Sequence, residues 1–249
     1  MRIPSAYGLL PGKTQALYTA LLEELDTYGP YSPDTILLDY EKALQNAVLS
    51  VWPGTTLRGC YFHHKKSLWK HFGQADLIPE YQVPNSPIRK AFQMMGAIPF
   101  VPIDDVDMVW RLLKPTLPSD MASFIQYYES TWIGTSSTPP LFAQWSWNQY
   151  DACQAGLPRS SNMAEGWHNG FKSLVNCSHP TIWKFLDSLK LEQALTDVKL
   201  AKNLMREPVE PRQQKWIKFD QRLDRLIESY DDFNDVLEYL RSVGCLMGC

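Results

Sequence analysis

Two carboxylates in this chain follow patterns that place them at the ends of regular elements, where a side chain can take part in binding or chemistry. Asp39 comes directly after the short apolar run over residues 35–38. Glu165 lies at the start of a predicted amphipathic helix. The carboxyl ends of strands border the ligand-binding crevice of open α/β sheets. Asp39 is therefore a candidate ligand-binding residue, and Glu165 is a second carboxylate at the start of a regular element.

Each carboxylate also has a purely structural interpretation. Asp39 precedes a predicted helix over residues 41–51, whose free backbone N–H groups it could cap. Asn162 followed three residues later by Glu165 matches a capping box, in which two side chains satisfy each other's backbone donors. From position alone, capping is the favoured interpretation of both.

A Cys/His pair about twenty residues after Asp39 is a second candidate site. Cys60 and His63 have a spacing that can place a thiolate and an imidazole on one Zn²⁺ ion. No second closely spaced ligand pair is present, so zinc is not expected, and a buried strand cysteine beside a helix-start histidine is an equal alternative. A hydrolase with Cys60 or Cys153 as nucleophile and His168 as base lacks a nucleophile-activating turn.

Two basic segments are candidate contacts for a phosphate backbone. The cations of the first are interleaved with aromatic residues and are Arg58, Lys65, Lys66 and Lys70. The cations of the second mark later predicted helices and are Lys199, Lys202, Arg206, Arg212, Lys215 and Lys218. For either segment alone, a solvated helix face is the simpler interpretation.

Composition limits the class of protein. The chain has 249 residues, 45% hydrophobic and 20% charged, which is typical of a globular domain with a sizeable core. A net charge of -3 argues against coating nucleic acid through bulk charge, so any DNA contact is regional. Five widely spaced cysteines and the absence of an apolar leader predict a reduced intracellular compartment. The sequence contains no window of about 20 apolar residues, so no membrane span is predicted. It contains no nucleotide-binding or zinc-protease motif, so no small-molecule substrate is predicted.

The hydrophobic pattern indicates how these residues are positioned. Strands are predicted over residues 3–10, 35–38 and 56–61, and helices over residues 14–25, 41–51 and 63–72. This alternation predicts an α/β sheet with parallel strands and helical crossovers. Helical patterns interrupted by prolines follow, then a long ordered connection, then an almost wholly helical C-terminal third. We therefore divide the chain into a core at residues 1–77, a helical insertion at 78–132, a connection and return helix at 133–178, and a helical region at 179–249.

Four segments, in this order, resemble the transposase domain of Mutator-like elements, the MULE domain. Residues 3–11, with Lys13, Thr14 and Tyr18, are similar to its strand-and-helix lead-in. Residues 36–43 are similar to its second-aspartate motif, and Cys60 to His63 to its C-x-x-H motif. Residues 147–150 and 159–168 resemble the segment that carries its catalytic glutamate. The resemblance extends to about residue 175.

The resemblance implies an RNase H-like fold with a helical insertion and DNA transposition by cleavage and strand transfer at phosphodiesters. Two Mg²⁺ or Mn²⁺ ions would stabilise the attacking and leaving oxygens. Asp39 and Glu165 would be two of three catalytic metal ligands, with Asn162 and His168 in support. Transposon-end DNA would be the partner and the nucleus the location, and a homo-oligomer is compatible with the family.

The family's first catalytic aspartate lies on a strand upstream of the lead-in, which here begins at residue 1. We therefore expect an N-terminally truncated domain whose sheet lacks its first strand and first ligand, and which is not a competent transposase alone. The alternative is a non-catalytic DNA- or protein-binding protein derived from a transposase.

Overall fold

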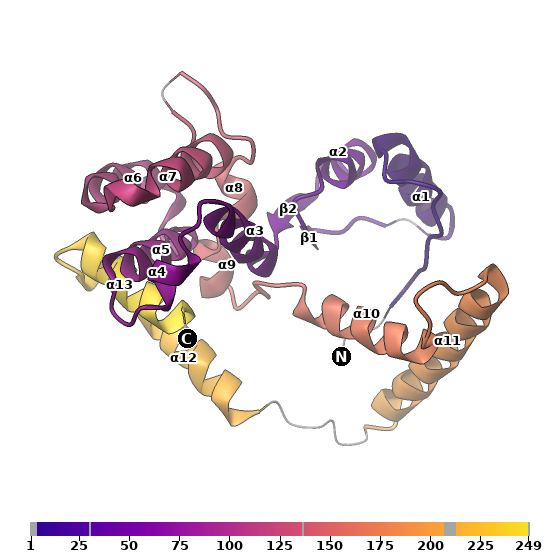
Figure 1. Ribbon diagram of the computed structural model, residues 1–249. Helices are drawn as coiled ribbons and strands as arrows, with labels where there is room; N and C mark the ends of the chain where they lie inside the picture. The colour runs from indigo at the N-terminus through magenta and orange to yellow at the C-terminus, as the bar shows by residue number, and fades with distance from the viewer. Residues whose placement is uncertain (1–3, 30, 136, 207–212, 249) are drawn as a thin grey trace. The chain divides into compact units, whose positions relative to one another are not determined.

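The computed structural model describes residues 4–29, 31–135, 137–206 and 213–248. The chain divides into two compact units. Unit 1 consists of Met1–Gly12 and Ser161–Gln213, and unit 2 of Lys13–Ser160 and Gln214–Cys249. The positions of the chain's parts relative to one another are not determined (Figure 1), so each unit is described by itself.

Unit 2 begins with alternating helices and strands. The Thr14 side chain caps the first helix by accepting a hydrogen bond from the Leu17 N–H (3.3 Å), as its position predicts. The two strands pair in parallel, from Thr35 opposite Thr56 to Leu38 opposite Gly59. The elements are α1 (Gln15–Thr27), β1 (Thr35–Leu38), α2 (Lys42–Val51), β2 (Thr56–Gly59) and α3 (Tyr61–Gln74). This βαβ arrangement confirms the predicted parallel pairing at residues 35–38 and 56–59.

The strands and the first two helices share a small core. Its buried members are Leu22, Ala47, Val48 and Leu57. The indole N–H of Trp52 also donates to Asp26 Oδ1 (3.0 Å), which ties the end of α2 to α1. We refer to these four buried residues as the strand cluster.

The rest of unit 2 is helical. Prolines divide residues 78–133 into short helices because a proline cannot donate the next helical hydrogen bond. Gly244 allows α13 to approach α5 closely, since a Cβ there would lie 2.7 Å from the Gln93 carbonyl oxygen. The principal helices are α4 (Ile78–Gln82), α5 (Pro87–Ala97), α6 (Val106–Leu113), α7 (Ala122–Tyr128), α8 (Gln144–Trp147), α9 (Tyr150–Gln154), α12 (Gln214–Glu228) and α13 (Val236–Met247).

These helices enclose a large aromatic core, which we call the helical core. Its largest fully buried side chains include Trp132, Trp147, Tyr128, Phe72 and Tyr239. Two of the buried polar ends have backbone partners: Tyr128 donates to the Met95 carbonyl (3.0 Å) and the Trp147 indole to the Trp132 carbonyl (3.1 Å). Burial of large aromatic rings with satisfied polar atoms makes this region the main source of stability.

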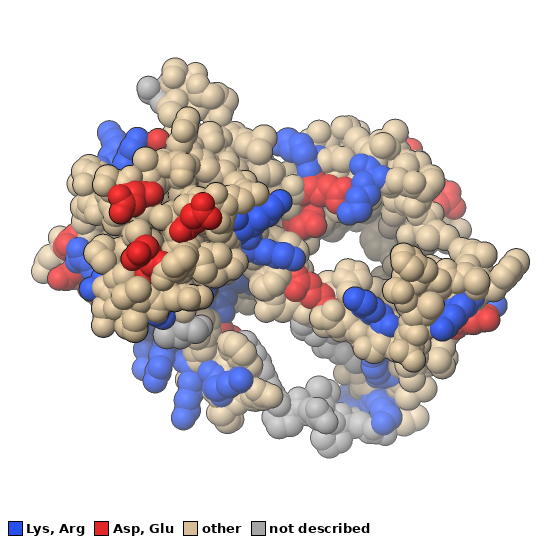
Figure 2. Space-filling view, viewed as in Figure 1, with Lys and Arg blue, Asp and Glu red and all other residues tan. Residues whose placement is uncertain are grey.

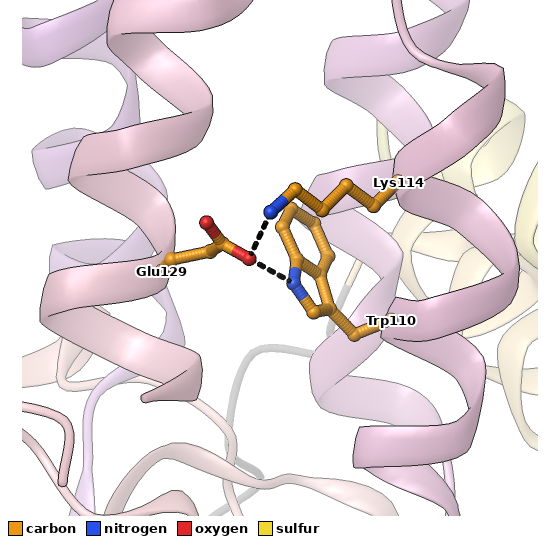
Figure 3. Close-up of polar contacts among 3 residues, drawn as sticks. All are labelled: Trp110, Lys114 and Glu129. Atoms are coloured by element: carbon orange, nitrogen blue, oxygen red, sulfur yellow. Dashed lines mark hydrogen bonds and ion pairs between the residues drawn. The ribbon is translucent and has the colours of Figure 1, made fainter. Parts of the chain in front are cut away.

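A single carboxylate joins two helical segments of this core. Glu129 begins the π-helical turn Glu129–Ile133 that follows α7. One of its oxygens accepts hydrogen bonds from the Trp110 indole (2.9 Å) and the Lys114 ammonium (2.7 Å), both from α6 and its extension (Figure 3). The turn is thereby fixed against α6.

Unit 1 contains a helical pair, α10 (Asn162–Val175) and α11 (Ile182–Leu204). The α10 helix ends at Asn176, whose left-handed conformation (φ 47°) is typical of a helix C-terminus. Trp167 donates to Glu192 Oε1 (2.8 Å) across the pair. Tyr7 packs on Trp167 with ring centroids 5.7 Å apart. The early segment of the chain therefore packs on this helical pair.

The structure corrects part of the predicted α/β sheet. The described residues of the predicted first strand, 4–10, form no strand, and residue 3 lies outside the described residues. Pro4 and Pro11 lack backbone donors, and Tyr7 packs on a helix instead. The predicted third strand ends at Gly59, because α3 begins at Tyr61. The predicted connection 133–160 also contains α8 and α9. The described part of the chain is mostly helical with one two-stranded parallel sheet.

None of the helices in the described ranges combines the length and apolar character that a bilayer crossing requires.

Candidate functional site

Asp39 lies at the carboxyl end of β1, as predicted, and its backbone is fixed on both sides. The buried Gln45 side chain donates to the Asp39 carbonyl (3.2 Å). The next residue, Tyr40, packs edge-on against Trp132 of the helical core with centroids 4.9 Å apart. The Asp39 side chain is half-buried, and no hydrogen bond or ion pair within the described ranges engages its carboxylate. The N-cap of α2 is Glu41, so Asp39 does not cap this helix.

A second carboxylate, which the sequence analysis did not single out, lies beside Asp39. Glu41 accepts a hydrogen bond from the Tyr18 hydroxyl (2.8 Å) and lies 3.6 Å from the Lys13 ammonium. Desolvation, the hydrogen bond to Glu41 and the charges of Glu41 and Asp39 raise the pKa of Tyr18 to about 12. Tyr18 is therefore a protonated donor at neutral pH. The sequence feature that could have identified this second carboxylate is the position of Glu41, two residues after Asp39.

Glu165 lies in the first turn of α10 and is half-buried. The N-cap of this helix is Ser161, whose carbonyl accepts the Glu165 backbone N–H (3.0 Å). Asn162 is already the first helical residue, so it does not occupy the cap position that the predicted capping box requires. A negative charge in a first turn is favoured by the helix dipole. Asn162 and His168 are both exposed on α10.

The structure does not bring the predicted carboxylates together. Asp39 belongs to unit 2 and Glu165 to unit 1, and the two units are not placed relative to one another. Within the described residues, no group of three or more His, Cys, Asp or Glu side chains is arranged to hold a metal ion.

The Cys60 and His63 pair sits at the start of α3. Cys60 is fully buried and is the N-cap residue of this helix, and His63 is half-buried with its ring against Phe62. The neighbouring His64 is fully buried and stacks on Trp132 with centroids 4.3 Å apart. Burial lowers the pKa of His64 to about 3, so this imidazole is neutral at physiological pH.

The cysteine-hydrolase alternative gains no support from Cys153. Burial raises the pKa of this thiol to about 11, the nearby Arg159 acting in the opposite direction. A nucleophilic cysteine requires a thiolate, so Cys153 is a poor nucleophile. The proposed base, His168, belongs to the other unit.

The first basic segment is only partly on the surface. Arg58 is buried, and its guanidinium donates to the Pro158 carbonyl (3.3 Å) and Gln149 Oε1 (3.0 Å). Lys65 is half-buried and donates to the Met247 carbonyl. Lys66 and Lys70 are exposed one turn apart on α3. Arg58 is thus an interior residue, and two lysines remain for contact with a partner.

The second basic segment is divided between the units. Lys199, Lys202 and Arg206 lie in unit 1, Lys215 and Lys218 lie on α12 in unit 2, and Arg212 lies outside the described residues. The structure adds two exposed cations that the sequence analysis missed, Arg222 and Arg225. The sequence feature that could have identified these two arginines is the spacing of residues 215, 218, 222 and 225, which places all four on one helix face.

Comparison with known proteins identifies the beginning of the chain. Residues 1–67 match the family model described as the MULE transposase domain. This range contains Asp39, Glu41 and the Cys60 and His63 pair. No curated protein and no solved structure matches the chain. The N-terminal part of this chain, residues 1–67, is therefore similar to the MULE transposase domain.

Proposed function

We propose that this chain is a transposase-derived domain whose Asp39 and Glu165 carboxylates bind Mg²⁺ or Mn²⁺ for cleavage of DNA phosphodiesters. The observation that carries the proposal is the position of Asp39, at the carboxyl end of a parallel strand within the residues that match the family. Glu165 is included because its segment resembles the family's catalytic glutamate region. Transposon-end DNA as partner and the nucleus as location belong to the same proposal.

Asp39 itself provides carboxylate oxygens of the kind that a hard divalent cation prefers. The Asp39 carboxylate is half-buried and is not engaged by another side chain in the described part of the chain. Glu41 fits less well as a first ligand, because Tyr18 and Lys13 already neutralise it. Bound divalent ions would stabilise the attacking and leaving oxygens of an in-line displacement.

The surrounding residues position this carboxylate. Gln45 holds the Asp39 carbonyl, and Tyr40 anchors the next residue in the helical core. A fixed backbone reduces the conformational freedom that a ligand must lose when a metal binds. Tyr18 keeps its proton at neutral pH and holds Glu41 beside Asp39.

The proposal is tested by cleavage of a labelled DNA duplex with the full chain and Mn²⁺. Asp39→Asn should abolish metal-dependent cleavage, because the neutral amide is a much weaker ligand. Asp34→Asn is the matched control, since Asp34 is exposed and precedes β1 at its opposite end. Cleavage that survives Asp39→Asn would refute the assignment of Asp39.

A second candidate function is a non-catalytic DNA-binding protein derived from a transposase. It is favoured by the exposed cations Lys215, Lys218, Arg222 and Arg225 on α12, which can contact phosphates without a metal. This alternative predicts duplex binding that requires no divalent ion and is unchanged by Asp39→Asn. The same two variants therefore discriminate between the two functions.

A further inference from the structure

The α12 helix has four cations on one face. Lys215, Lys218, Arg222 and Arg225 follow one another at intervals of three or four residues, so they form a row along the helix. The row spans about 15 Å at 1.5 Å per residue. All four residues are exposed, and Figure 2 shows lysines and arginines gathered over α12, at the lower left.

In the part of the chain that the structure describes, no acidic side chain pairs with this row. The Lys215 ammonium lies 5.0 Å from the ring centroid of Trp216, an aromatic contact that leaves its charge uncompensated. The acidic residue Asp220 lies on a different face of α12 and pairs with Arg159. The helix therefore presents an uncompensated positive face.

The C-terminal end of the row borders an open surface depression. This depression has a volume of about 350 Å³ and is lined by Arg222, Arg225, Leu226, Ser229 and Leu246. Guanidinium groups match the geometry of phosphate oxygens and can donate two hydrogen bonds to one phosphate. The Ser229 hydroxyl already donates to the Leu226 carbonyl (3.1 Å), so the two arginines are the donors that face a phosphate here. The two leucines provide apolar contact for a sugar.

We propose that this face of α12 binds the phosphate backbone of DNA. A row of four cations fits a polymer with regularly spaced negative charges better than it fits a single phosphate group. Backbone contacts of this type provide affinity without sequence readout. The choice of DNA among polyanions rests on the proposed function, whereas the location on α12 rests on the charge row and the open depression beside it.

The test is binding of the full chain to a fluorescently labelled duplex of random sequence, measured by anisotropy over a range of KCl concentrations. Arg222→Gln combined with Arg225→Gln should weaken binding by about tenfold, since two charge-assisted contacts are lost. The plot of log K against log[KCl] should become shallower by about 1.8, or about 0.9 for each lost phosphate contact. Lys90→Gln combined with Arg111→Gln is the control, because both residues are exposed elsewhere in unit 2 and the change in net charge is equal.

Equal losses in the two double variants would show that bulk charge is responsible and would overturn the proposal. Tighter binding of the wild-type chain to phosphatidylserine vesicles than to the duplex would also overturn it. Lys215→Gln combined with Lys218→Gln provides a second measurement if the arginine variant unfolds. Unchanged duplex binding in the α12 variants with Asp39-dependent cleavage intact would defeat this inference and leave the proposed function standing. Weaker duplex binding in the α12 variants, together with cleavage that does not depend on Asp39, would defeat the proposed function and leave this inference standing.

Discussion

The two cores of unit 2 differ in size and in what they contribute. The strand cluster has four buried residues and lies within the residues that match the family. The helical core is far larger and lies mostly outside that match. The two meet at the carboxyl ends of the strands, where Tyr40 packs on Trp132 and Gln149 donates to the Gly59 carbonyl (3.0 Å). The helical core therefore fixes the strand ends beside which Asp39 lies.

The largest expected effect is a truncation in the helical core. Trp132→Ala removes a fully buried ring that contacts Tyr40 and His64, so we expect the free energy of unfolding to fall by about 3–5 kcal/mol. Leu22→Ala in the strand cluster should cost about 2 kcal/mol, because Leu22 lies in a smaller core that can relax around the change. Urea denaturation measures both values. Equal losses of unfolding free energy in the two variants would contradict the claim that the helical core contributes more stability than the strand cluster.

A smaller effect should come from the buried imidazole of the helical core. Neither ring nitrogen of His64 has a hydrogen-bond partner in the described part of the chain. His64→Phe removes these unsatisfied atoms and should stabilise the protein by about 1–3 kcal/mol at pH 7. His179→Phe, at an exposed position, is the control.

The same residue predicts a loss of stability in acid. Its pKa is about 3 in the folded protein, below the ordinary value of 6.5, so below pH 6.5 the unfolded chain binds a proton that the folded chain does not. The stability present above pH 6.5 is lost as the pH falls toward 3, by up to about 1.4 kcal/mol per pH unit. Denaturation of the wild type and His64→Phe at several pH values measures this slope. An identical slope in both would contradict the assignment to His64.

Sequence patterns correctly predicted the elements that depend on neighbouring residues in the chain, such as a capped helix and a short apolar strand. The helix after Thr14, the strand at residues 35–38 and the position of Asp39 at its end were all confirmed. The prediction of a strand at residues 3–10 was wrong over the described residues, 4–10, because strand formation depends on a neighbouring strand that the local sequence does not specify. Tyr7 instead packs on Trp167, a contact distant in sequence.

Whether the basic residues predicted to contact DNA are exposed depends on contacts with residues far away in the sequence. Arg58 had the composition of a DNA contact, but its hydrogen bond to Gln149 joins residues far apart in the chain. The row of cations on α12 follows from the spacing of its residues once the helix is known to begin at Gln214. Sequence patterns thus identify a cation, whereas tertiary structure decides whether the cation is exposed.

Mn²⁺ binding to the full chain, measured by calorimetry, tests most directly whether the fixed strand end is a metal site. We predict that Asp39→Asn weakens binding by more than about tenfold, a loss that follows even from removal of outer-shell partners. We predict that Asp34→Asn leaves the affinity unchanged, because Asp34 lies at the other end of β1 and its backbone carbonyl, which the substitution keeps, accepts the Thr56 N–H (2.9 Å). Equal Mn²⁺ affinities in the wild type and both variants would contradict the account.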